Sequence, residues 1–92
     1  MIYATKLKMK PGCKDSKSLL EIDEVYLTGC SRPGYYKKGA VHEHVKKYPG
    51  SIKVNIRPFP NVIPSTSING EKYVRSNPDA FKHDDLLDLP RE

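Results

Sequence analysis

Two histidines separated by one residue, His42 and His44, are the first side chains in this sequence that could hold a metal ion. On a strand, positions i and i+2 share one side, and both rings could reach the same ion. The surrounding pattern predicts a helix, on which two such positions lie roughly 160° apart. We therefore expect the two rings to diverge, with His44 beside the apolar stripe of the helix as a partly buried core histidine.

Acidic and thiol groups offer two further candidates. The run His83, Asp84 and Asp85 could bind a hard cation weakly, although helix capping and solvated carboxylates explain it better. Cys30 with a histidine could form a nucleophile and its base, but neither cysteine lies in a catalytic signature. The sequence also lacks a phosphate-binding glycine loop, a CxxC pair and a GxSxG motif. We expect a non-enzymatic protein without metal or cofactor; an enzyme would need a concave pocket around Cys30 or His44.

Basic side chains interleaved with tyrosines are the stronger candidate. The lysines of the first predicted strand share one side of it, and Lys53 and Arg57 share one side of a later strand. Cations beside aromatic rings contact phosphates and stack on unpaired bases. We hypothesise a nucleic-acid-binding face built from these strands and from the loop 31–39, with Lys6, Lys8, Arg32, Tyr35, Tyr36, Lys37, Lys38, Lys53 and Arg57.

The competing interpretation of these residues is an ordinary solvated surface. In that case Tyr35 or Tyr36 turns into the core, and the carboxylates of Glu21, Asp23 and Glu24 neutralise the first row of lysines. The alternative function is protein interaction, either through an exposed strand 62–68 at a sheet edge or as a homodimer.

Length and charge limit the class of protein. A chain of 92 residues makes one domain with a small core. The net charge is +5, and residues 1–60 hold twelve Lys or Arg against five Asp or Glu, which favours a polyanionic partner. No apolar run is long enough to span a bilayer, so we expect a cytoplasmic protein with no membrane contact. Cys13 and Cys30 follow opposite ends of a predicted hairpin, so we expect free thiols.

The apolar pattern predicts an α+β fold, in which a single domain has an antiparallel-rich sheet and one helix packed on one face. The first two strands are expected to pair as a hairpin. The predicted order is β-β-α-β-β-β with a terminal helical turn: strands 2–9 and 22–28, helix 40–48, strands 51–57, 62–68 and 71–76, and the turn 86–89.

Alternation within these elements predicts which side chains face the core. The inward sets are Tyr3, Leu7 and Met9 on the first strand, Val41, Val45 and Tyr48 on the helix, and Ile52, Val54 and Ile56 on the strand that follows.

The dipeptide Asn69-Gly70 predicts a hairpin between the last two strands. Both residues tolerate positive φ, which a two-residue type I′ turn requires. Such a turn places Thr66 opposite Tyr73. Pro64 inside the preceding strand indicates a sheet edge or a bulge.

The last segment of the sequence predicts a plug for the core. Leu86 and Leu89 lie three apart and share one side of the turn that Pro90 ends, and Phe81 is a second expected anchor. The functional alternative is a docking motif that offers the leucines to a partner.

This ending resembles a family of small uncharacterised domains from bacterial, archaeal and phage proteins. The family pattern is Gly-x-x-Tyr-aliphatic-Arg-Ser/Thr-x-Pro-Asp, a short spacer, then Asn-Leu-x-x-Leu-Pro. Asp85 stands where the family often has asparagine. The resemblance implies no activity, and we expect Arg75 to clamp Asp79 or another carboxylate near the end of the sequence. The structural motif comprises Asn69 and Gly70 of the turn, with Tyr73, Arg75, Pro78, Asp79, Leu86, Leu89 and Pro90.

Overall fold

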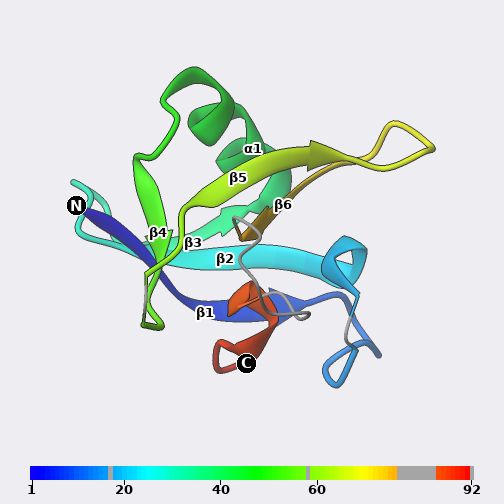
Figure 1. Cartoon of the computed structure of the whole chain (residues 1–92). Coiled ribbons are helices and arrows are strands. Elements are labelled where there is room, and N and C mark those ends of the chain that lie inside the picture. Colours follow the sequence, from blue (N-terminus) through cyan, green and yellow to red (C-terminus); the bar gives the residue numbers. More distant parts are fainter. Residues whose placement is uncertain (17, 58, 77–84, 92) are drawn as a thin grey trace.

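Six strands surround one core in the computed structural model, which describes residues 1–16, 18–57, 59–76 and 85–91 (Figure 1). The four-stranded sheet has the order β3-β2-β1-β4, and β5 and β6 form a separate pair. The strands are β1 (Ile2–Met9), β2 (Ile22–Thr28), β3 (Gly34–Lys37), β4 (Ile52–Val54), β5 (Val62–Thr66) and β6 (Lys72–Ser76). The helix is α1 (Lys38–Lys47), and two 3₁₀ turns are η1 (Leu19–Glu21) and η2 (Asp85–Asp88). The predicted α+β class with one helix is confirmed.

The first hairpin forms at the predicted residues, but a bulge changes which side chains of β1 face the core. The pairing shifts by one residue between Ala4 and Lys6, so Thr5 is an extra residue in β1. Ala4 and Leu7 are therefore both fully buried. The predicted inward position of Tyr3 is wrong, because the bulge puts Tyr3 on the opposite side from the core.

The predicted loop 31–39 contains a strand and the start of the helix. Gly34–Lys37 pairs antiparallel with β2, and α1 begins at Lys38 rather than at residue 40. Val41 and Val45 are buried as predicted. Tyr48 is not part of the stripe, since it is the C-cap residue and is 52% exposed, and its ring lies against that of His44.

Strand β4 is shorter than the predicted strand 51–57 and pairs in parallel with β1. The ladder ends where the Asn55 amide donates to the Ala4 carbonyl, and the chain then turns, with Phe59 N–H bonded to the Ile56 carbonyl. Ile52 and Val54 are buried, and Ile56 packs against the core from its turn. The Val54 amide donates to the Pro60 carbonyl, which ties β4 to the start of β5.

The hairpin β5–β6 forms, but its predicted register is wrong by one residue. Thr66 lies opposite Lys72 and Ser65 opposite Tyr73. The Ser67 amide donates to the Glu71 carbonyl, and the Gly70 amide donates to the Ser67 carbonyl. Gly70 has φ +84° while Asn69 has no positive φ, so the loop has three residues and a left-handed glycine instead of a type I′ turn.

The end of the chain closes the core. Leu86 and Leu89 are buried as predicted, and the Leu7 amide donates to the Pro90 carbonyl next to β1. The Arg91 guanidinium donates to the carbonyls of Lys14, Ser16 and Leu87. The plug interpretation thus agrees with the packing of both leucines. The expected anchor Phe81 and the run at His83 and Asp84 lie outside the described residues, as does the side chain of Asp85.

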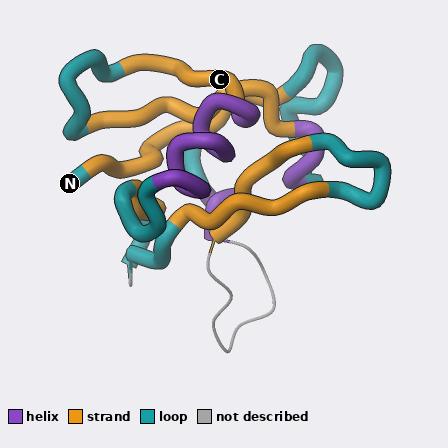
Figure 2. Tube along the Cα trace, turned by 90° about the horizontal axis from the view of Figure 1, so that it is seen from above, coloured by secondary structure: helices purple, strands orange, loops and turns teal. Residues whose placement is uncertain are grey.

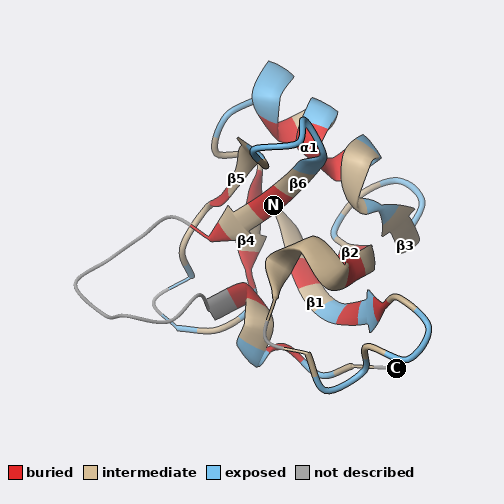
Figure 3. Cartoon of the chain, turned by 90° about the vertical axis from the view of Figure 1, so that its right-hand side faces the viewer, coloured by how far each residue is buried: buried red, intermediate tan, exposed pale blue. Residues whose placement is uncertain are grey.

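Helix α1 covers the inner side of the sheet. It packs against the β5–β6 hairpin and against β2 and β3, and in the view from above it lies in front of the strands (Figure 2). The buried residues of α1 are on the side turned towards the strands (Figure 3). No helix among the described residues is long and apolar enough to cross a membrane.

Candidate functional site

The side of the four-stranded sheet that faces away from α1 carries a central row of one lysine and two tyrosines. We call this side the outer face. Lys6, Tyr26 and Tyr35 are neighbours across β1, β2 and β3. The ring centroids of Tyr26 and Tyr35 are 5.0 Å apart with the planes nearly perpendicular, and Lys6 Nζ lies 5.1 Å from the Tyr26 centroid. This is an aromatic surface with a cation against it.

The next row of the outer face is charged. Lys8, Glu24 and Lys37 are neighbours across the same three strands. Lys8 Nζ is 3.7 Å from Glu24, and Lys37 Nζ is 3.3 Å from Asp23. The lysine side chains remain 51% and 67% exposed. Exposed ion pairs contribute at most about 1 kcal/mol, so a phosphate can replace the carboxylate as a partner.

A second aromatic pair lies at the β4 end of the outer face. Tyr3 is the neighbour of Lys53, and its ring centroid is 6.0 Å from that of Phe59. Phe59 is 38% exposed and has φ +61°, an uncommon conformation for a bulky residue. Lys53 Nζ donates to Asn61 Oδ1 at 2.8 Å, and Arg57 is exposed in the turn before Phe59.

Three of the predicted site residues do not lie on the outer face. Tyr36 faces inward opposite Val25 and packs against the core, and its hydroxyl donates to the Arg32 carbonyl. Lys38 is only 12% exposed, because its ammonium bonds to the Leu20 carbonyl and to Glu71. Arg32 is exposed in the loop between β2 and β3. The structure thus brings together Lys6, Lys8, Tyr35, Lys37 and Lys53, with Arg57 at the border.

Sequence reasoning missed Tyr26 and Phe59 as site residues and assigned Tyr3 to the core. The signal for Tyr26 is its place on β2 between the apolar residues Val25 and Leu27, both of which are buried in the structure. Phe59 is flanked by two prolines in a turn, which is a weak sign of exposure.

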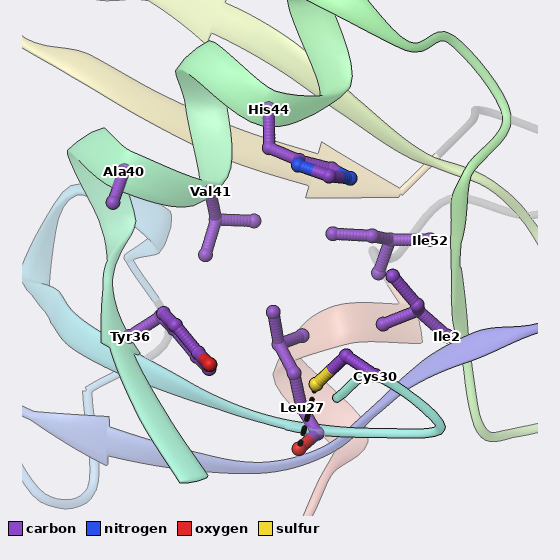
Figure 4. A pocket seen from close by; sticks show the side chains of 8 residues that line it. All are labelled: Ile2, Leu27, Cys30, Tyr36, Ala40, Val41, His44 and Ile52. Atoms are coloured by element: carbon purple, nitrogen blue, oxygen red, sulfur yellow. Dashed lines mark hydrogen bonds between the residues drawn. The ribbon is translucent and has the colours of Figure 1, made fainter. Parts of the chain in front are cut away.

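The histidines point to different elements, as predicted. His42 is 3% exposed and its Nδ1 lies 2.9 Å from the Tyr73 carbonyl oxygen. His44 is half-buried and lines a pocket on the inner side of the sheet (Figure 4). Only one of the two rings therefore faces the pocket.

Both cysteines are free thiols, as predicted. Cys13 Sγ donates to Glu21 at 2.8 Å, and hydrogen bonds from Cys13 and then Ser16 lower the pKa of the Glu21 carboxyl. The same hydrogen bond raises the pKa of the Cys13 thiol. Cys30 lies at the far end of the hairpin and lines the same pocket as His44.

The motif residues of the last strand have structural partners where the structure describes them. The Tyr73 carbonyl meets His42, and Arg75 lies opposite Ile63 on β5. Within the described part of the chain, Arg75 Nε is buried without a hydrogen bond. The predicted partner Asp79 and the neighbouring Pro78 lie outside the described residues.

Comparison with known proteins identifies one family. Neither the curated proteins nor the solved structures gave a match to the chain. A family model described as "Protein of unknown function (DUF3892)" matches residues 14–90. This match spans most of the 92 residues and includes the ending that suggested a family of unknown function. The chain belongs to the DUF3892 family.

Proposed function

We propose that the outer face binds single-stranded nucleic acid. The observation that carries this proposal is the row in which Tyr26 lies between Lys6 and Tyr35 on a sheet side away from the helix. Aromatic rings on an open sheet stack on bases, and neighbouring cations hold the phosphates between them. Tyr3 and Phe59 supply a second place to stack at the β4 end.

The chemistry of the rows favours a single strand over a duplex. A base can stack on tyrosine only when its own face is free, and a duplex hides those faces in its interior. The lysines of the charged row border the aromatic row, so a backbone can follow the cations while its bases meet the rings. Asp23 and Glu24 lower the affinity for an anion, because they form ion pairs with Lys37 and Lys8, but both lysine side chains stay more than half exposed and can also meet phosphates.

The alternative, protein contact through a sheet edge, has less support. Strand β5 pairs on one side with β6, which agrees with the predicted edge. Pro64 lies in the middle of β5 and has no amide hydrogen to donate to an added strand. A homodimer through the same edge meets the same obstacle.

Fluorescence polarisation with labelled oligo-dT, oligo-rU and a duplex of equal length tests the proposal. Contacts to about four phosphates predict a slope of roughly −3 in a plot of log affinity against log salt. Lys6→Gln should reduce that slope by about 0.7, and Lys46→Gln, the same charge change on the exposed side of α1, should not.

Tyr26→Ala should weaken binding by roughly 5- to 100-fold, and Tyr26→Phe, which keeps the ring, should change it little. Circular dichroism of each variant separates loss of binding from loss of fold. Absence of binding at low salt, or equal effects of the Lys6 and Lys46 substitutions, would overturn the proposal.

A further inference from the structure

The pocket between α1 and the sheet is not explained by the proposed function, since it lies on the inner side, away from the outer face. It has a volume of about 170 Å³. Ile2, Leu27, Val41 and Ile52 form its apolar walls, and Cys30, Tyr36 and His44 also line it and carry polar atoms (Figure 4). These residues come from β1, β2, α1, β4 and the loop after β2, so the whole fold shapes the pocket.

The size of the pocket suits one ring. An apolar cavity of roughly 150 Å³ is known to stay dry and to hold benzene. The wall side chains are already ordered by the core, where Leu27, Val41 and Ile52 are almost fully buried. A ligand therefore enters a preformed site and gains the burial of its own apolar surface.

The lining also sets the charge of the ligand. Among the described residues that line the pocket there is no Lys, Arg, Asp or Glu, so a charged group would lose its hydration without a partner. The Tyr36 hydroxyl already donates to the Arg32 carbonyl and the Cys30 thiol is directed at the Leu27 carbonyl, which leaves the His44 ring as the polar group for a ligand. Its ring points towards the pocket between Val41 and Ile52 (Figure 4), and its ring contact is with Tyr48. Within the described part of the chain, neither nitrogen of its ring has a hydrogen-bond partner.

We propose that this pocket binds a compact, uncharged aromatic ring that carries one hydrogen-bonding group, with that group placed at His44. Access is available at the rim, where Ala40 is exposed and both Cys30 and His44 are half-buried. The Cys30 thiol lines the pocket, with its sulfur 4.0 Å from the Leu27 carbonyl oxygen, so an occupied pocket shields it from reagents.

The two thiols of the intact protein allow a direct test with phenol as the probe. The protein is alkylated with a small neutral reagent, and the rate at each cysteine is followed by peptide mass spectrometry. Phenol should slow the alkylation of Cys30 several-fold and leave that of Cys13 unchanged, because Cys13 lies at the other end of the hairpin beside Glu21. Benzoate, which has the same ring and a charge, should protect neither thiol.

A second measurement tests the role of His44. In an NMR titration, the methyl groups of Ile2 and Ile52 should shift with phenol and with benzene, and phenol should bind about five-fold more tightly. His44→Leu should remove that preference while benzene still binds. Unchanged Cys30 rates and unchanged methyl signals up to the solubility limit of phenol would overturn the proposal. A phenol preference that survives in His44→Leu would overturn the assigned hydrogen bond. Neither outcome depends on nucleic-acid binding, so this proposal and the previous one fail separately.

Discussion

Replacement of Leu86 by alanine distinguishes a plug for the core from a docking motif for a partner. The Leu86 side chain is fully buried in the same cluster as Leu7, so its removal leaves a cavity as well as losing apolar contacts. Substitutions of this type cost roughly 2–5 kcal/mol. A domain of 92 residues has an expected stability of roughly 5–14 kcal/mol, so the loss is a large part of the total.

Urea unfolding followed by circular dichroism measures this loss. With a slope of about 1 kcal/mol per molar urea, a loss of 3 kcal/mol lowers the midpoint by about 3 M. Ile68→Ala is the matched control, because Ile68 is fully exposed at the hairpin loop and its loss should change stability by less than about 0.5 kcal/mol. If Leu86→Ala unfolds at the same urea concentration as Ile68→Ala, the reasoning that η2 belongs to the core is refuted.

Two further predictions concern a glycine and an ion pair. In thermal melts, Gly29→Ala should destabilise the fold far more than Gly12→Ala. Both glycines have φ near +80°, so the backbone strain of the substitution is similar at the two positions. An added Cβ at Gly29 would lie 2.1 Å from the Met1 carbonyl oxygen, whereas one at Gly12 would have no atom within 4 Å. Equal melting temperatures would contradict the close approach. The hydrogen bond from Lys38 lowers the pKa of Glu71, so the stability that this pair contributes is present above the unfolded value near 4.5 and is lost as pH falls through the lower folded pKa. Glu71→Gln should therefore lower the free energy of unfolding at pH 7 but not well below pH 4. An equal loss of stability at both pH values would argue against a contribution from the ionised Glu71–Lys38 pair.

The local sequence pattern predicted the strands best where Pro or Gly residues mark their ends. The bounds of β1 and β2 agree with the prediction because Pro11-Gly12 and Gly29 end two clearly alternating runs. Strand β3 was missed because its four residues lie between Pro33 and the helix, too short a run to show alternation. The parallel pairing of β4 with β1 depends on how the chain crosses over the core, which no local pattern encodes.

The register of the strands, and the side of the sheet on which each side chain lies, were harder to predict than the strands and helix themselves. The bulge at Thr5 depends on how β1 pairs with β2, so the alternation of residues along β1 alone does not predict it. At the other hairpin, Asn69-Gly70 suits loops of two or three residues. The Ser67 hydroxyl accepts a hydrogen bond from the Glu71 amide, which favours the longer loop.

Only part of the candidate site was predicted, because the rest depends on which strands lie side by side. The lysines of β1 project together as expected, whereas the role of Tyr26 depends on β3 lying beside β2. Tyr35 and Tyr36 are adjacent on a strand and so take opposite sides of the sheet, which is why only one of them reaches the outer face.

The central position of β1 in its sheet determines which fragment of this protein can fold on its own. The family match begins at residue 14, yet β1 ends at Met9 and bonds to β2 on one side and to β4 and Pro90 on the other. A fragment cut to the matched residues would lose the middle of its sheet, including Leu7, which belongs to the same core cluster as Leu86. Such a truncation would yield an incomplete domain, and expression trials gain by retaining the first nine residues.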